Sequence, residues 1–317
     1  MKKEQIRRRS SRRIGCRKRG HDYRAPSKYH ITIHKVQDCI NFSEIIIKEL
    51  TPEGVILKLS LLGQVIWRQI RAMQTPYFRV YQYKIMPDHI HLLIHVKKYL
   101  PMHLSHYIAR FKTLIMQEWR QKISKSEIKI FEEGYHDRIV MPGQSLDVVF
   151  KYIRQNPYRL AVRRARPEFF RKERNIFIEG REIQAYGNLF YLRNPFKYAL
   201  IVHRADDERI FTQKLQECLY YAHNGGIVVS AFISAREKEI RKAIEEEEGR
   251  IILIGDRPFD ERAKPARHDF ELCSEGRLLI ISPIDYLALP KSEHPSRSQC
   301  LNMNAFAEKL ARNPEIR

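Results

Sequence analysis

Residues 86–96 read Met-Pro-Asp-His-Ile-His-Leu-Leu-Ile-His-Val, and this stretch decides how the first half of the chain folds. Successive side chains of a β-strand point to opposite faces of a sheet. One face is then apolar, with Ile90, Leu92, Ile94 and Val96, and the other carries His89, His91, Leu93 and His95. The stretch therefore predicts a strand with a core on one side and histidines on the other.

His89 and His91 are two residues apart on this strand, so their imidazoles can point at one location. Neutral ring nitrogens in that arrangement suit a divalent cation. The alternative is a strand with one solvated face, on which histidines are merely tolerated. His95 lies about 13 Å beyond His91 at the rise of a strand, so we leave it out of the site.

The charge of the chain is concentrated in its first half. Residues 1–175 hold 37 Lys and Arg against 15 Asp and Glu, and residues 176–317 hold 21 against 22. An electropositive surface of this kind is expected of a protein that meets phosphates, and a general solubility charge explains the asymmetry poorly. The composition therefore favours a nucleic-acid partner.

The five cysteines are scattered and form no CxxC pair, which favours neither a disulfide framework nor a zinc site. The sequence contains no apolar run near 18 residues and no signal-peptide core behind its basic start. We expect a soluble, intracellular protein of 317 residues with two globular domains and no membrane contact.

Residues 1–28 form a basic arm with few apolar residues, which we expect to be flexible. Its arginines could lie along a phosphate backbone, and the candidates are Arg7, Arg8, Arg9, Arg12 and Arg13. Removal of the arm should then flatten the salt dependence of DNA binding.

Residues 29–175 alternate between strand and helix patterns. Strands are expected at 29–34, 55–59 and 77–86, and a turn and short strand at 131–140. Ser60 can cap a helix that Pro76 ends, and Pro101 opens another helix. Arg110 and Lys112 on that second helix are candidate DNA contacts, equally well explained as a solvated face. Arg138 in the short strand is a further candidate.

Ser145 begins a helix that we expect Pro157 to end. Tyr152 lies at the edge of its apolar stripe, and Asn156 lies one turn later on the same face. A basic run follows at 159–174, in which Arg163 and Arg164 are candidate DNA contacts.

Residues 176–317 have a different pattern, in which short apolar strands alternate with helices. Strands are expected at 196–203, 226–230, 250–254 and 277–282, with helices at 206–222, 235–248 and 298–312. The pattern predicts an α/β domain with a parallel sheet. An accessory role in DNA binding or oligomerisation and a purely structural role explain it equally well.

Three segments of the first half resemble one family when they are taken together. They are Pro87-Asp88-His89-Ile90-His91, Gly134-Tyr135-His136-Asp137-Arg138 and Tyr152-Ile153-Arg154-Gln155-Asn156-Pro157. In order and spacing they resemble the REP-associated tyrosine transposases, a branch of the single-tyrosine transposases of the HUH endonuclease superfamily. The opening at residues 22–33 is also similar, so the resemblance covers roughly residues 20–165.

The resemblance implies an α+β fold for residues 29–175, a ferredoxin-like antiparallel sheet with helices on one side and the histidines on a central strand. It implies that His89 and His91 bind Mg²⁺ or Mn²⁺ with Asn156 as a third ligand, and that Tyr152 is the nucleophile. The implied partners are single-stranded or hairpin DNA and a second copy in a homodimer. The implied location is the bacterial cytoplasm, at the nucleoid.

The implied activity is a transposase that cuts and rejoins single-stranded DNA through a covalent phosphotyrosine. A metal ion would polarise the scissile phosphate, and the covalent bond would conserve the energy for rejoining. Three alternatives remain: a domesticated non-cleaving nucleic-acid binder, an RNA-binding module, and a nuclease that uses activated water. Tyr135 and Tyr158 are the nearest rivals to Tyr152, and His34 and His136 could approach the metal.

The second half weakly resembles the Rossmann-like domain of the DNA-processing protein DprA, in residues 226–234, 250–254 and 276–281. The glycine-rich loop of that family is replaced by Ala231-Phe232-Ile233-Ser234. We therefore expect a smaller, Rossmann-like α/β domain at 176–317 with no bound cofactor, and phosphate binding before the helix at Ala235 is in doubt.

Overall fold

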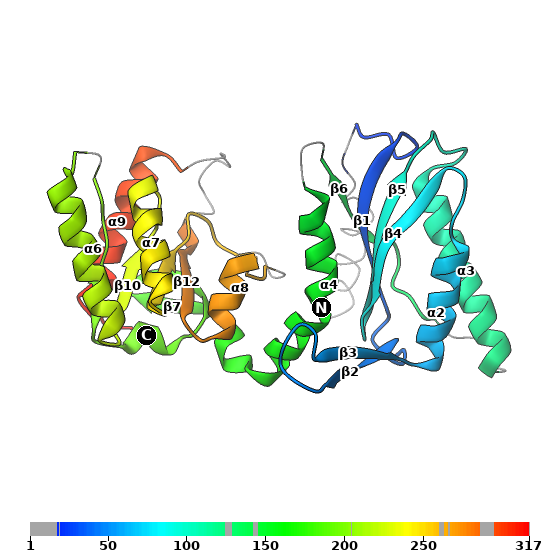
Figure 1. The fold of residues 1–317 in the computed structure, drawn as a ribbon, viewed down its shortest axis with the longest axis horizontal. Coiled ribbons are helices and arrows are strands. Elements are labelled where there is room, and N and C mark those ends of the chain that lie inside the picture. The colour runs from blue at the N-terminus through cyan, green and yellow to red at the C-terminus, as the bar shows by residue number, and fades with distance from the viewer. Residues whose placement is uncertain are drawn as a thin grey trace. The chain divides into compact units, whose positions relative to one another are not determined.

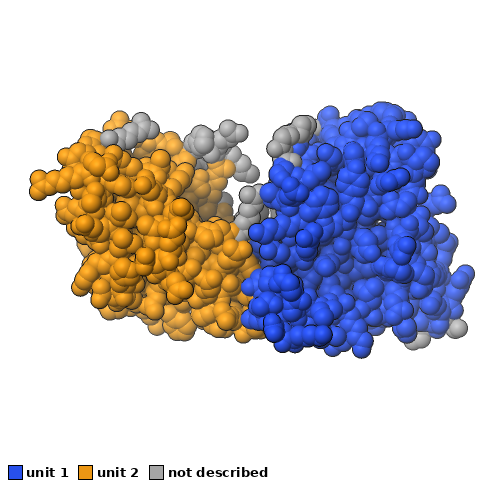
Figure 2. All heavy atoms as spheres, in the orientation of Figure 1, with its two compact units in different colours: residues 1–161 blue, residues 162–317 orange. Residues whose placement is uncertain are grey.

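The structure is a computed structural model that describes residues 18, 20–123, 129–141, 145–203, 205–259, 263–265, 267–285 and 295–316. The proposed DNA contacts Arg7, Arg8, Arg9, Arg12 and Arg13 lie outside these residues. The chain divides into two compact units, Met1–Ala161 and Val162–Arg317, which Figure 2 colours separately.

The first unit is built on an antiparallel sheet of four strands (Figure 1). In spatial order these are β4 (Phe78–Ile85), β5 (His89–Val96), β1 (Ser27–His34) and β6 (His136–Val140). The histidine strand β5 pairs with both β4 and β1. The predicted α+β fold, with the histidines on an interior strand, is therefore confirmed.

Two helices cover the apolar face of this sheet, α2 (Leu61–Ala72) and α3 (Leu104–Ile123). Ile90, Leu92, Ile94 and Val96 are fully buried against them, as the alternation of residues 86–96 predicts. The Ser60 hydroxyl accepts a hydrogen bond from the Gly63 amide, so Ser60 is the N-cap of α2.

The opposite face of the sheet is covered by α4 (Leu146–Ala165), where Leu93 and Val140 pack against Val149 and Ile153. The resemblance implied helices on one side only, and this detail is wrong. The reason is that Leu93 interrupts the histidine face with a large apolar side chain, which needs an apolar cover.

Pro157 does not end α4, contrary to the prediction, because the helix runs on to Ala165. A proline inside a helix loses one backbone hydrogen bond and costs about 3 kcal/mol. Here Pro157, Ala161 and Val162 are buried, and this burial offsets the cost. The Asn156 side-chain amide donates to the Tyr152 carbonyl at 2.8 Å, which gives the backbone an added partner at the same turn.

Strand β4 contains a bulge that changes which residues face α4. Phe78 and Val80 pair with Val96 and Ile94, after which the register shifts and Gln82 pairs with Leu93. The extra residue reverses the parity of the strand. Gln82 therefore lies on the histidine face, where its side chain donates to the Phe150 carbonyl of α4.

A separate two-stranded sheet precedes α2. It pairs β2 (Ser43–Ile47) with β3 (Val55–Leu59), of which only β3 was predicted. The Ser43 hydroxyl donates to the Ile85 carbonyl and fixes the start of this hairpin to β4.

The second unit contains a six-stranded sheet in the order β7-β8-β12-β11-β10-β9. The strands are β7 (Arg171–Ile178), β8 (Arg181–Gly187), β9 (Lys197–Ala199), β10 (Ile227–Ser230), β11 (Arg250–Ile254) and β12 (Leu278–Pro283). Strands β9 to β12 pair in parallel, as predicted, and β7 and β8 extend the sheet antiparallel.

The observed boundary between the units lies earlier in the chain than the predicted one, because β7 belongs to the second sheet. The predicted second domain begins at 176, but residues 171–173 already pair with β8, and the division falls at 161/162. The difference arises because the predicted basic run 159–174 is the end of α4, a 3-10 helix at Pro167–Phe170 and the start of β7.

Helices cover both faces of the second sheet (Figure 1). The helices α6 (Glu208–His223), α7 (Ala235–Glu246) and α8 (Arg267–Ser274) pack on one face, and α9 (Arg297–Ala311) packs on the other, beside the short helix α5 (Phe190–Arg193). Strands β9, β10, β11 and β12 are neighbours in chain order, and right-handed crossovers then place their connecting helices on one face. This order has no reversal among the parallel strands, and the Rossmann-like assignment stays a prediction.

No helix in the described part of the chain combines the length and the apolar character needed to cross a membrane.

Candidate active site

Among the described residues, six histidines lie on the face of the first sheet that α4 covers, and all but His95 gather toward one end of it. Register places them together, because side chains of directly paired residues lie on the same face. His34 pairs with His89 and Thr32 pairs with His91 across β1 and β5, and Thr32 pairs with His136 across β1 and β6. His30, two residues before Thr32, shares this face.

Asp88 orients His89. Its carboxylate lies 2.7 Å from His89 Nδ1. This hydrogen bond is the main reason why the pKa of Asp88 is far below its usual range. An imidazole that donates from Nδ1 keeps a lone pair on Nε2. This arrangement is the usual way in which a protein orients a histidine toward a cation.

His91 is only 4% exposed and is held from both ring nitrogens. Its Nε2 lies 3.0 Å from His89 Nε2, and its Nδ1 lies 3.0 Å from His30 Nε2 and 3.2 Å from Thr32 Oγ1. Burial lowers the pKa of His91 well below its usual value, the neighbouring histidines add to this, and a hydrogen bond with Asn156 opposes it.

His30 is also neutral at physiological pH. Burial lowers its pKa to about 4, and the nearby charges of Arg138 and His89 lower it further. Because a neutral imidazole has one donor and one acceptor nitrogen, His30 Nε2 can accept from a protonated His91 Nδ1. His91 would then present a lone pair from Nε2.

The candidate nucleophile Tyr152 lies directly beside these histidines. Its ring centroid is 5.8 Å from that of His30 and 5.9 Å from that of His91, and the side chain is 41% exposed. The Arg159 guanidinium lies 5.9 Å from the centre of the tyrosine ring. Tyr152 therefore combines closeness to His91 with access to solvent.

The residues present fit a divalent cation at His89 and His91. Two Nε2 lone pairs 3.0 Å apart repel each other unless a proton or a cation lies between them. Among the described residues, no group of three or more His, Cys, Asp and Glu side chains is arranged to hold a metal ion. The amide of Asn156, which hydrogen-bonds His91, is a protein group that could supply an oxygen ligand.

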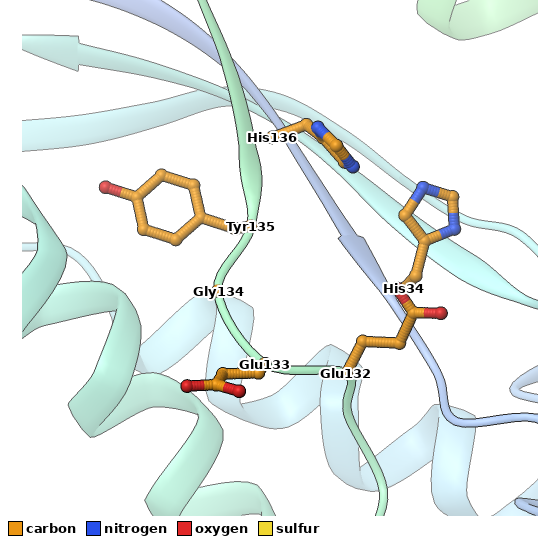
Figure 3. A pocket seen from close by; sticks show the side chains of 6 residues that line it. All are labelled: His34, Glu132, Glu133, Gly134, Tyr135 and His136. Atoms are coloured by element: carbon orange, nitrogen blue, oxygen red, sulfur yellow. The ribbon is translucent and has the colours of Figure 1, made fainter. Parts of the chain in front are cut away.

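A small pocket lies at one end of the histidine face (Figure 3). It is lined by His34, Glu132, Glu133, Gly134, Tyr135 and His136. The His34 ring lies 5.2 Å from that of His89 and 5.8 Å from that of His136, measured between centroids. His34 therefore approaches His89, and His136 lies beside His34. In the figure the Tyr135 side chain points away from both histidines.

The basic residues proposed as DNA contacts are spread over the fold. Arg138 pairs with His30 across β6 and β1 and so lies on the histidine face. Arg110 and Lys112 belong to α3, which covers the opposite face. The Lys112 ammonium donates to the carbonyls of Glu132 and Gly134, so it supports the loop before β6.

Arg163 and Arg164 lie in the last turn of α4. They are 11 and 12 residues beyond Tyr152, or about 16–18 Å along the helix axis. The structure thus brings His89, His91, Tyr152, Asn156 and Arg138 together and leaves Arg110, Lys112, Arg163 and Arg164 apart from them.

The start of α7 in the second unit does not offer a free phosphate site. The buried Glu237 carboxylate accepts hydrogen bonds from the amides of Val202, Ile233 and Ser234, at 2.8 to 3.1 Å. Ser234 and Glu237 form a capping box there. A carboxylate of the chain itself thus occupies the place where an anion would bind a helix N-terminus.

Sequence reasoning missed His30, Thr32 and Lys84, which all lie on the histidine face. His30 and Thr32 alternate with His34 in the predicted strand 29–34, so their shared face was visible in the sequence. The pairing of that strand with β5 was not, because register depends on contacts far apart in the chain.

A match to a known protein family falls on the same region of the chain. Residues 60–156 match the family model described as "Transposase IS200 like". This part of the chain is similar to IS200-like transposases. It contains His89, His91, Tyr152 and Asn156, and it confirms the resemblance to transposases over these residues.

Two solved structures are also similar. One is described as a REP-associated tyrosine transposase bound to a REP hairpin; it is 12% identical, with 43% of this chain and 68% of that chain covered and a TM-score of 0.26. The other is described as a transposase from Deinococcus radiodurans R1; it is 13% identical, with 44% and 98% covered and a TM-score of 0.25. No curated protein sequence matches the chain. The family match supports a transposase function.

Proposed function

We propose that this protein is a metal-dependent transposase that cuts and rejoins single-stranded DNA through a covalent bond to Tyr152. One observation carries the proposal. The Nε2 atoms of His89 and His91 converge to 3.0 Å, and the exposed Tyr152 ring lies 5.9 Å from the His91 ring. A nucleophile and a cation site therefore share one surface that a strand can reach.

The reaction is an exchange of phosphate esters. The Tyr152 oxygen attacks the scissile phosphorus, the P–O bond to the 3′-oxygen breaks, and a phosphotyrosine forms. The phenol proton is lost and the leaving oxygen gains one as the 3′-hydroxyl. Attack by another 3′-hydroxyl reverses these steps and rejoins DNA without an external energy source.

The residues of the chain position this chemistry. Asp88 orients His89, and His30 with Thr32 orients His91, so both Nε2 atoms point to one location. Asn156 contacts His91 and also donates to the Tyr152 carbonyl, which ties the helix turn of the nucleophile to the histidines. A Mg²⁺ or Mn²⁺ ion held by His89, His91 and Asn156 would polarise the phosphate.

The substrate is proposed to be single-stranded DNA, with hairpin ends as the favoured form. The first 175 residues carry the positive charge that such a strand requires. Hairpins are included in the test because the solved structure of another protein is described as bound to a REP hairpin. We also propose that the protein is a homodimer and is located in the cytoplasm, at the nucleoid.

The test is a search for the covalent intermediate. A labelled single-stranded oligonucleotide from the flanks of the gene, with a hairpin, is incubated with the protein and Mn²⁺ and run on a denaturing gel. Wild type is compared with Tyr152→Phe and with Tyr220→Phe. Tyr220 is a suitable control because it is an exposed tyrosine on a helix of the second unit.

The proposal expects an adduct in wild type and Tyr220→Phe and none in Tyr152→Phe. An adduct that survives in Tyr152→Phe would assign the nucleophile to another residue, with Tyr135 and Tyr158 examined next. Cleavage without any adduct would favour activated water. Tight binding without cleavage on several hairpins would favour a domesticated binder.

A further inference from the structure

Lys84 lies on the histidine face because of the bulge in β4. It pairs directly with His91 across β4 and β5, so the two side chains leave the sheet on the same side. Before the bulge the parity is opposite, with Phe78 and Val80 paired to residues of the buried core face. The extra residue thus directs an ammonium group toward the proposed metal site.

Lys84 forms no ion pair with an acidic side chain in the part of the chain that the structure describes. It is half-buried, and burial lowers its pKa, with the nearby charge of Arg154 lowering it further. Neither Lys84 nor Arg154 has a hydrogen-bond or ion-pair partner among the residues that the structure describes. Two neighbouring cations without an acid cost stability, and proteins accept costs of this kind mainly at functional sites.

An ordinary structural role does not account for Lys84. Edge strands such as β4 often carry lysines that block association, but those lysines project into solvent. Arg79 of the same strand is exposed and suits that role. Lys84 instead is half-buried on the histidine face, and its pKa is lowered by the charge of Arg154, an exposed residue two positions after Tyr152 on α4.

We propose that Lys84 and Arg154 together bind a backbone phosphate of the DNA strand, next to the phosphate that Tyr152 attacks. The site takes a phosphodiester anion, and it rests on the proposed function for the identity of the strand. Helix α4 carries both Tyr152 and Arg154, and β5 places His91 beside Lys84. The strand would therefore cross the sheet face from the nucleophile toward β4.

Binding of DNA, without cleavage, tests this site. Lys84→Gln and Arg154→Gln are each made in the Tyr152→Phe protein. Their affinity for a fluorescent oligonucleotide of about 20 thymidines is measured over a range of salt concentrations. The control is Lys58→Gln, an exposed lysine in β3 of the separate hairpin. Each site variant should bind about 3- to 10-fold more weakly and lose about 0.7 from the salt slope, and the control should keep both.

Thermal unfolding separates lost binding from lost folding. Lys84→Met removes a half-buried charge and keeps an unbranched side chain. Without DNA, the thermal unfolding midpoint of this variant should therefore equal or exceed that of the protein that keeps Lys84. Weaker DNA binding in a variant that is no less stable is the expected result.

Two outcomes would overturn the site. One is an unchanged salt slope in Lys84→Gln and Arg154→Gln, and the other is an equal change in Lys58→Gln. Because no cleavage is needed, these results are independent of the adduct test. A protein without Tyr152 chemistry can still show the phosphate site, and a protein with that chemistry can lack it.

Discussion

The two units of this protein treat their buried polar groups in opposite ways. In the second unit, the Glu237 carboxylate accepts hydrogen bonds from the backbone amides at the start of α7. Arg241 forms ion pairs with both Glu245 and Asp269. In the first unit, the Nε2 atoms of His89 and His91 face each other, and the half-buried Lys84 has the charge of Arg154 near it but no ion pair among the described residues.

This difference indicates where a ligand is needed. A polar group with its partners inside the chain gains nothing from an anion or a cation, whereas one without partners is stabilised by binding. The histidine face therefore has the features of a ligand-binding site. The start of α7 has those of a structural element whose hydrogen bonds are satisfied within the chain. Four predictions test this contrast.

The largest effect is expected from His91→Ala. The substitution removes one of two converging ring nitrogens, so Mn²⁺ affinity should fall more than about 100-fold, and cleavage with it. Metal binding is measured by calorimetry on the protein without DNA. His95→Ala is the control, because His95 bonds Tyr81 at the far end of the strand. Equal losses in both variants would refute the assignment.

Glu237→Ala should destabilise the second unit. It leaves three backbone amides, of Val202, Ile233 and Ser234, without their acceptor. The free energy of unfolding should fall by about 3 kcal/mol, measured by urea denaturation. Glu239→Ala, exposed on the same helix, should change it by less than about 0.5 kcal/mol. If phosphate restored the variant, the start of α7 would be an anion site after all.

His30→Ala should weaken the metal site without removing a ligand. His30 Nε2 is 3.0 Å from His91 Nδ1, and loss of such a partner typically costs 10- to 100-fold in metal affinity. The same calorimetric measurement checks it. Thr32→Val tests whether the hydroxyl shares this role, and a smaller loss is expected because its contact is longer, at 3.2 Å. Unchanged affinity in His30→Ala would show that Thr32 alone holds His91.

The smallest effect is expected in the pH dependence of the stability of the second unit. A hydrogen bond with Glu245 raises the pKa of His268 above its usual value. The charged pair therefore stabilises the fold fully below about pH 6.5, and this contribution is lost as the pH rises through the higher folded-state pKa. Because His268 is largely exposed, the difference should stay under about 1 kcal/mol. Urea denaturation of wild type and His268→Gln at pH 5.5 and pH 8.5 measures it, and equal differences at both would contradict the pairing.

Much of this fold was visible in the sequence, because its periodicities are local. The alternation of residues 86–96 defined β5 and its two faces, and Ser60 and Ser145 marked helix starts. The hairpin of β7 and β8 was missed because the first half of β7 is charged. Its only local signal is the turn at Glu179 and Gly180, which both have positive φ.

The parts that sequence reasoning did not reach depend on distant contacts. Pro157 stays inside α4 because its helix is packed against the first sheet, and tertiary packing outweighs a local preference. His30 joins the site only through the pairing of β1 with β5. Lys84 was assigned to no face because a single inserted residue in β4 is invisible in the alternation of a strand.

That inserted residue has a consequence for how the gene can change. Phe78 is fixed in the core at one end of β4, and Lys84 lies opposite His91 at the other. Loss of the codon for Tyr81 would leave an odd separation between them, and regular pairing would then still place Phe78 opposite Val96 and Lys84 opposite His91. Deletion of Tyr81 should thus be tolerated in evolution far better than deletion of Leu92 in β5, which would turn one end of the histidine strand over.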